Sequence, residues 1–137
     1  MRKTPQNESG RWLTQARVEF TDADELRKRG RYYIALFHFQ QSAEKALKGY
    51  LCQAAESVEI IYTHSIAELL EMATEVDPDF KDVWNTKKLD VYYIQTRYPN
   101  GLPGGVPAHF FDDPKEAEEA MQLARNLIEL VEQKLSM

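Results

Sequence analysis

The stretch YYIALFHFQQSAEKALKGYL, residues 32–51, decides the fold of this chain. Apolar side chains occupy most of the circumference of a helix drawn through it. The apolar surface is broken by Gln40, Gln41, Glu44, Lys45 and Lys48. A helix that is apolar nearly all round must be surrounded by other elements. We therefore predict a central helix over about 32–55, buried by other helices or at a subunit interface.

Two more helices are expected on either side of this segment. Apolar residues at three- and four-residue spacing indicate a first helix over about 11–29, and Gly30 is its stop signal. Ser65 followed by Glu68 has the form of a capping box and begins a third helix. Asp77-Pro78 ends that helix, because the residue before a proline disfavours helical backbone.

The remainder of the chain predicts two further helices separated by a loop. The fourth, from about Asp79 to Pro99, is expected to bury one helical stripe made of Phe80, Val83, Trp84, Lys87, Val91 and Ile94. Gly and Pro concentrate in residues 98–112, which predicts a long loop. Asp113 is the expected N-cap of the last helix. The predicted fold is all-α, a mostly antiparallel up-and-down bundle of four to five helices with no strand.

Length and composition narrow the class of protein. The chain has 137 residues, which predicts a single domain over 1–137 with its core at about 12–131. Its net charge of −5 argues against a mainly electrostatic nucleic-acid binder. One cysteine, no apolar run of membrane-spanning length and no secretory signal pattern predict a cytoplasmic protein that does not enter a membrane. No Cys/His cluster or Glu-x-x-His pattern is present, so no metal is predicted.

The candidate ligand site is Arg97-Tyr98, at the end of the fourth predicted helix. An arginine beside a Gly/Pro-rich loop can bind a phosphate with its planar, bidentate fork. Tyr93 and Tyr98 could contact a base or sugar. Lys45 and Lys48 would add positive charge from the central helix. A structural role is also open, in which Arg97 caps the helix and pairs with an acid such as Asp90 or Glu44.

Three segments together resemble the HEPN domain family. They are the run from Gly30 to Leu51, the sequence Thr63-His64-Ser65-Ile66, and LDVYYIQTRYP at residues 89–99, which places the chain in the branch with a TRYP-type motif. The resemblance implies a helical bundle that commonly forms a homodimer. It also implies a module that binds a nucleotide, such as ATP or GTP, or acts with a minimal nucleotidyltransferase, as in some toxin–antitoxin pairs. These roles favour a non-enzymatic protein.

A metal-independent ribonuclease is an alternative that the same resemblance raises. The family's ribonuclease branch uses an arginine and a histidine with four to six residues between them, late in the bundle. Arg31 and His38 fit that spacing but lie early, and Arg97 is followed by His109 only after eleven residues. In this reading Arg31 or Arg97 would polarise the phosphate of an RNA and His38 or His109 would be the general base.

A third possible function is a purely structural dimerisation subunit. His64 precedes the Ser65 cap and is expected to be a local hydrogen-bonding or packing residue.

Overall fold

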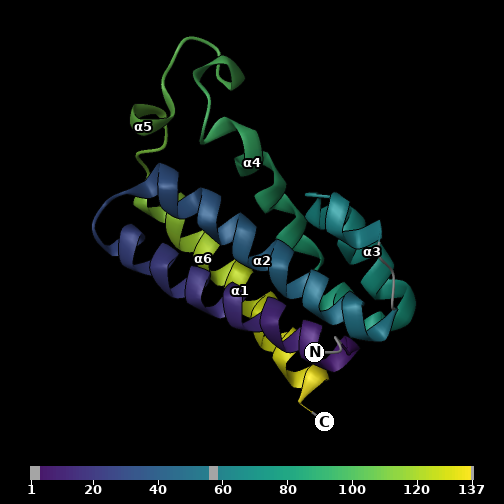
Figure 1. Ribbon diagram of the computed structural model, residues 1–137. Coiled ribbons are helices and arrows are strands. Elements are labelled where there is room, and N and C mark those ends of the chain that lie inside the picture. The colour runs from purple at the N-terminus through teal and green to yellow at the C-terminus, as the bar shows by residue number, and fades with distance from the viewer. Residues whose placement is uncertain (1–3, 56–58, 137) are drawn as a thin grey trace.

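A computed structural model describes residues 4–55 and 59–136, and over these residues it is a bundle of helices without a strand (Figure 1). The predicted all-α fold class is therefore confirmed. The α-helices are α1 (Pro5–Lys28), α2 (Tyr32–Ala54), α3 (Ile66–Val76), α4 (Tyr92–Gln95), α5 (Pro107–Phe110) and α6 (Pro114–Leu135). The 3-10 helices are η1 (Glu59–Tyr62), η2 (Pro78–Val91) and η3 (Pro99–Gly101).

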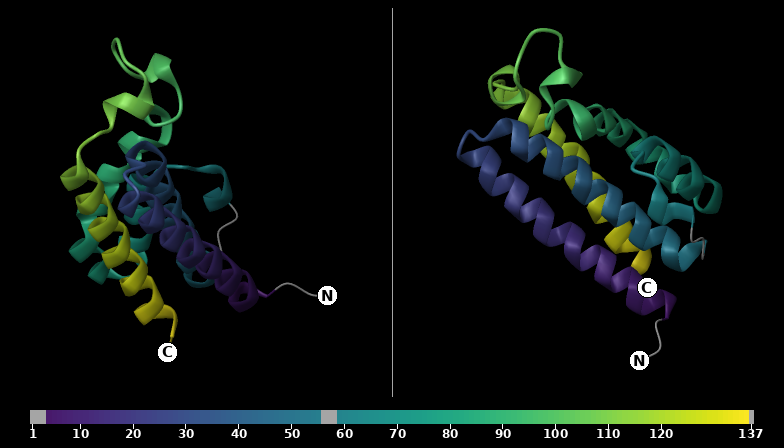
Figure 2. Two further views of the ribbon diagram at one scale, coloured as in Figure 1. Left: turned by 90° about the vertical axis from the view of Figure 1, so that its left-hand side faces the viewer. Right: turned by 45° about the horizontal axis from the view of Figure 1, so that its top comes forward.

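Helices α1 and α2 form an antiparallel hairpin, and α6 packs beside both, running in the same direction as α2 (Figures 1 and 2). Gly30 makes the turn of the hairpin with a φ of +75°, a conformation that favours glycine. Helix α1 begins well before the predicted Arg11. The Thr4 hydroxyl caps it by accepting a hydrogen bond from the Asn7 backbone N–H at 3.1 Å.

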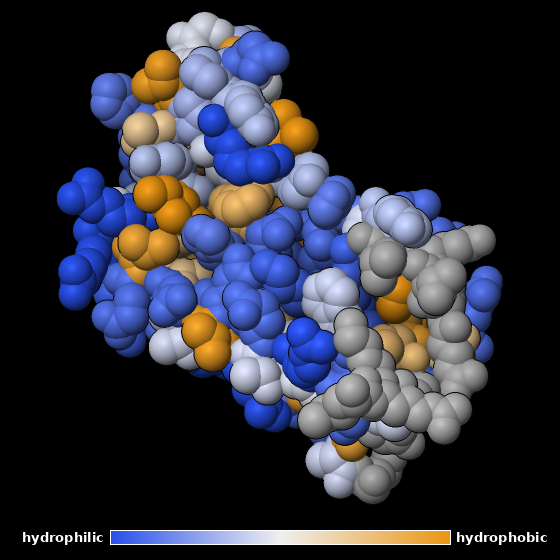
Figure 3. All heavy atoms as spheres, in the orientation of Figure 1, coloured by the Kyte–Doolittle hydropathy of each residue, from blue (hydrophilic) through white to orange (hydrophobic). Residues whose placement is uncertain are grey.

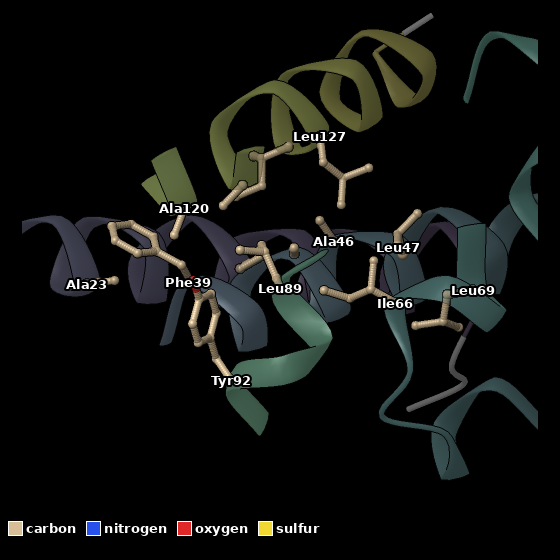
Figure 4. Close-up of a cluster of buried hydrophobic side chains, with 14 of the residues drawn as sticks. Ala23, Phe39, Ala46, Leu47, Ile66, Leu69, Leu89, Tyr92, Ala120 and Leu127 are labelled. Carbon is tan, nitrogen blue, oxygen red and sulfur yellow. The ribbon is translucent and has the colours of Figure 1, made fainter. Parts of the chain in front are cut away.

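Helix α2 is the centre of the bundle, as its composition predicts. Figure 4 shows its Phe39, Ala46 and Leu47 in one buried cluster with side chains from η2, α3, α4 and α6. The labelled partners in that cluster include Ile66, Leu69, Leu89, Tyr92, Ala120 and Leu127. Every one of these side chains is almost entirely withdrawn from solvent. Burial of this apolar surface is the main force that holds the helices together.

The predicted fourth helix is wrong in type and in buried face. Residues 78–91 form the 3-10 helix η2, with a kink at Val83, and only Tyr92–Gln95 return to α-helix. A 3-10 helix has three residues per turn. Its buried positions accordingly recur every third residue, at Phe80, Thr86, Leu89 and Tyr92, with half-buried Val83 between them. Val91 and Ile94, expected inside, are each 47% exposed.

Asp90 of η2 joins this segment to the start of α3. Its carboxylate accepts hydrogen bonds from the backbone N–H groups of Ile66 at 2.7 Å and Ala67 at 3.0 Å. The predicted Ser65 cap is confirmed, since its hydroxyl accepts from the Glu68 N–H at 3.2 Å. The reciprocal half of the capping box is not formed, because the Glu68 carboxylate instead accepts from the Thr63 hydroxyl.

The Gly/Pro-rich segment 98–112 is not a bare loop. It contains η3 and α5, and it is fastened to the bundle by three buried side chains, Leu102, Pro107 and Phe111. It stands out from one end of the bundle in Figure 1. Asp113 then caps α6 as predicted, accepting from the Lys115 N–H at 2.9 Å.

Candidate functional site

The Arg97 guanidinium lies among three aromatic rings. Its Cζ atom is 4.6 Å from the ring centre of Tyr93, 4.7 Å from that of Phe37 and 5.1 Å from that of Tyr98. The imidazole of His64, which precedes α3, stacks on the Tyr93 ring. We call these five residues the Arg97 cluster: Phe37, His64, Tyr93, Arg97 and Tyr98.

The residues of the Arg97 cluster come from three separate parts of the chain. Tyr93 lies in α4 and Arg97 follows two residues after its end, and a hydrogen bond from Arg97 Nε to the Tyr93 carbonyl holds the two residues together. Phe37 comes from α2, and His64 comes from the residues just before α3. Because Asp90 binds the first N–H groups of α3, it fixes the start of α3, and with it His64, beside α4.

Arg97 is a cation at the surface of the bundle. Within residues 4–55 and 59–136, no acidic side chain lies within ion-pair distance of its guanidinium, and the side chain is exposed. Its Nε donates a hydrogen bond to the Tyr93 carbonyl at 2.8 Å, so it does cap the end of α4. The expected acid partners are engaged elsewhere: Asp90 with α3, and Glu44 with Lys48.

Glu44 and Lys48 form a buried ion pair at 3.0 Å, with both side chains 3% exposed. Gln40 and Gln41 contact the same carboxylate at 3.4 Å through their amide groups. His64 Nδ1 also lies 3.4 Å from a Glu44 oxygen, so this buried network ends at the Arg97 cluster. Lys48 itself points inward, where its amine lies 5.7 Å from the Trp12 ring centre.

A second network surrounds Glu19 of α1. His38 Nδ1 lies 2.7 Å from one Glu19 oxygen and the Lys45 amine 2.5 Å from the other. Burial by itself would raise the pKa of Glu19, but the hydrogen bonds and charges of His38 and Lys45 outweigh it and hold the pKa below its ordinary value. Lys45 is therefore committed to Glu19. Neither predicted lysine belongs to the Arg97 cluster.

The other predicted residues do not converge. Arg31 is exposed at the N-cap of α2, and His109 is exposed in α5. In the part of the chain that the structure describes, neither arginine of the ribonuclease reading has a hydrogen bond or ring contact with His38 or His109. The structure brings together Arg97, Tyr93 and Tyr98 as predicted, and adds Phe37 and His64.

Apolar side chains remain exposed around this end of the molecule. They are Val91, Ile94, Tyr98, Val106 and Phe110, each between 44% and 54% exposed. In Figure 3 hydrophobic residues stand singly or in small groups among hydrophilic ones. Beyond Tyr98, an open hollow of about 820 Å³ is lined by η3 and α5 residues that include Pro99, Asn100, His109 and Phe110.

Two kinds of site are not found among the described residues. No three His, Cys, Asp or Glu side chains gather in a way that could hold a metal ion. None of the helices described is long and apolar enough to cross a membrane.

Comparison with known proteins gives matches over nearly the whole chain. The family model described as "HEPN domain" matches residues 9–134. The crystal structure of TT1696 from Thermus thermophilus is 39% identical, with a TM-score of 0.81, covering 93% of this chain and 98% of that one. The structure of ST0689, an archaeal HEPN homologue, is 28% identical with a TM-score of 0.75 and the same coverage. No curated protein matches.

Proposed function

The chain belongs to the HEPN domain family, and from this premise we propose that it is a nucleotide-binding module whose ligand is held by the Arg97 cluster. Arg97 would bind the phosphate, and Tyr98 with Tyr93 would contact the base or sugar. ATP and GTP are the candidate ligands. The module would work without catalysing a reaction itself.

The observation that carries this proposal is the fixed orientation of the Arg97 guanidinium together with the absence of a carboxylate partner among the described residues. Its Nε is held by the Tyr93 carbonyl and its plane by aromatic rings, so its orientation is set before any ligand arrives. The two terminal NH₂ groups have no carboxylate partner among the described residues. A planar pair of donors suits the two oxygens of a phosphate.

The exposed ring of Tyr98 supports the same proposal, because a nucleotide base could contact it. It is 47% exposed and lies beside the guanidinium, so one face or edge remains open to solvent. Stacking of a base on an aromatic side chain contributes about 1–3 kcal/mol. A nucleotide could therefore use its phosphate and its base at neighbouring positions of one small surface.

The proposal is tested by thermal unfolding in the presence of nucleotides. A ligand that binds only the folded protein raises Tm as its concentration exceeds Kd. We expect ATP or GTP to raise the Tm of the wild type and to raise it much less in Arg97→Ala. Arg97→Lys, which keeps the charge but not the fork, should fall between the two.

Arg125→Ala is the matched control. Arg125 is also an exposed arginine over an aromatic ring, 5.7 Å from the ring centre of Phe20, but it lies on α6. Its removal should leave the nucleotide-induced shift unchanged. Equal shifts in wild type and Arg97→Ala would contradict the site assignment, and the absence of a shift with any nucleotide would contradict the function.

A second candidate function, partner binding, is favoured by the exposed apolar residues around α4 and α5. A minimal nucleotidyltransferase is the expected partner, as in a toxin–antitoxin pair, and a second copy of this chain is the other. Such a surface would gain stability by excluding water from Ile94 and Phe110. The test is light scattering of the protein alone and mixed with a minimal nucleotidyltransferase. Ile94→Asp should weaken either complex if this surface forms it.

A further inference from the structure

We propose that a hollow between α3 and η2 is a ligand site apart from the Arg97 cluster, and that it binds a small organic cation, an amine with an apolar body. This α3–η2 hollow has a volume of about 620 Å³ and is lined by Glu71, Thr74, Glu75, Pro78, Lys81 and Trp84. None of these residues belongs to the Arg97 cluster. The inference therefore does not depend on the proposed function.

The walls of the α3–η2 hollow are fixed by contacts within the protein. Helices α3 and η2 lie side by side (Figure 2), and Asp77 joins them, accepting a hydrogen bond from the Asp79 N–H at 3.0 Å. Lys134 of α6 pairs with Asp77 at 2.8 Å and with Asp79 at 2.5 Å, which ties this junction to the bundle. Small-molecule sites are usually pre-formed hollows of about 300–1,000 Å³. In size and rigidity the hollow suits such a ligand.

Trp84 gives the hollow a surface that can hold both an apolar group and a cation. Its side chain is half-buried, and Pro78 adds a second apolar ring to the lining. The Lys87 amine lies 4.9 Å from the Trp84 ring centre, although Lys87 does not line the hollow. The indole therefore already attracts one ammonium group within the protein, as the negative potential of its face predicts.

Two carboxylates give the hollow its preference for positive charge. Glu71 and Glu75 are four residues apart on α3, so they share one face of the helix and repel each other. Both are exposed, and within residues 4–55 and 59–136 neither lies within ion-pair distance of a basic side chain. Lys81 opposes this preference, but the lining still carries one negative charge in excess. A bound ammonium would relieve the repulsion between the two acids while its apolar body contacts Trp84.

The experiment follows the indole N–H signal of Trp84 in nitrogen-15 NMR spectra of the whole protein, while phenethylamine or 2-phenylethanol is added at pH 7. The two probes have nearly the same shape, but only the amine is charged, because an alkyl amine has a pKa of about 10. We expect the amine to bind about fivefold more tightly than the alcohol, as one close ion pair in water would give. The signal of Trp12, on α1, should not move.

The double variant Glu71→Gln, Glu75→Gln keeps the size of both side chains and removes their charge. It should bind the amine no more tightly than the alcohol. Glu118→Gln, which changes an exposed acid on α6, is the matched control and should keep the fivefold preference. A preference for the amine that persisted in the double variant would overturn the role of the carboxylates.

Two results with the wild type would also overturn the proposal. Equal affinities for the amine and the alcohol would rule out a site selective for cations. No movement of the Trp84 signal with either probe would rule out the hollow as a binding site. Both results would leave nucleotide binding at Arg97 untouched, since that is measured with a different ligand and a different variant.

Discussion

The Asp90 carboxylate binds the backbone N–H of Ile66 at 2.7 Å, so one acid of η2 caps a helix that begins twenty-four residues earlier in the chain. N-terminal N–H groups of a helix have no partner within the helix itself, and a negative charge there is favourable. This contact also determines where His64 lies relative to Tyr93. The same hydrogen bonds of Asp90 therefore cap α3 and set the geometry of the candidate site.

Asp90→Ala should lower the free energy of unfolding by about 1–3 kcal/mol, because it leaves two N–H groups of α3 without their acceptor. Asp90→Asn should cost less, since the amide oxygen can still accept. Denaturant unfolding measures both. Asp82→Ala, an exposed acid on the same 3-10 helix, is the control and should change stability little. Equal effects at positions 82 and 90 would show that the cap is not important.

The three-residue period of η2 predicts a contrast between two neighbours. Leu89→Ala removes a fully buried side chain and should cost about 2–5 kcal/mol. Val91→Ala removes a side chain that is 47% exposed and should cost less than about 1 kcal/mol. An α-helix with the stripe predicted from sequence would bury Val91 instead. Denaturant midpoints that ranked the two variants in the opposite order would disprove the period of three.

Gly49 lies where α2 packs tightly against α1. A Cβ atom added there would lie 3.0 Å from the Trp12 Cβ and 3.2 Å from the Ser9 carbonyl oxygen. Gly49→Ala should therefore lower stability by about 1–3 kcal/mol through crowding. In Gly10→Ala the new Cβ meets nothing within 4 Å, so the gain in helix propensity should raise stability by up to about 1 kcal/mol. Calorimetric Tm values of the pair would show opposite shifts.

Glu19 should make the fold sensitive to acid. Its pKa is lower in the folded protein than its ordinary value of 4.5, so the ionised carboxylate stabilises the fold above that pH. The contribution is lost as pH falls through the lowered pKa. We expect Glu19→Gln to be less stable than wild type at pH 7, and the difference to shrink below about pH 4.5. A difference that stayed constant down to low pH would contradict the assignment.

Much of the bundle follows from sequence pattern alone. Helix α2 begins and ends within a residue of the predicted positions, and α6 begins at the predicted Asp113 cap, because apolar periodicity and capping act within each helix. The 3-10 form of η2 could not be predicted in this way. Its apolar residues allow an α-helical stripe as well as a three-residue one, and contacts with the rest of the bundle decide between them.

The candidate site was predictable only where its residues are close in the sequence. Tyr93, Arg97 and Tyr98 lie within one short segment, and their spacing brings them together. Phe37 and His64 arrive from other elements, and no local pattern connects them to Arg97. The lysines differ in this respect. Glu44 and Lys48 are four residues apart on α2, so their pairing follows from sequence spacing, whereas Glu19, the partner of Lys45, comes from α1 and can be identified only after the helices are packed.

The 3-10 winding of η2 makes the chain intolerant of insertions and deletions there. With three residues per turn, adding or removing one residue rotates everything after it by about 120°. A one-residue insertion before Leu89 would turn Asp90 away from α3 and turn Tyr93 and Arg97 away from Phe37 and His64. The number of residues from Phe80 to Tyr92, more than the identity of those on the exposed side, is what a working relative of this protein would have to preserve.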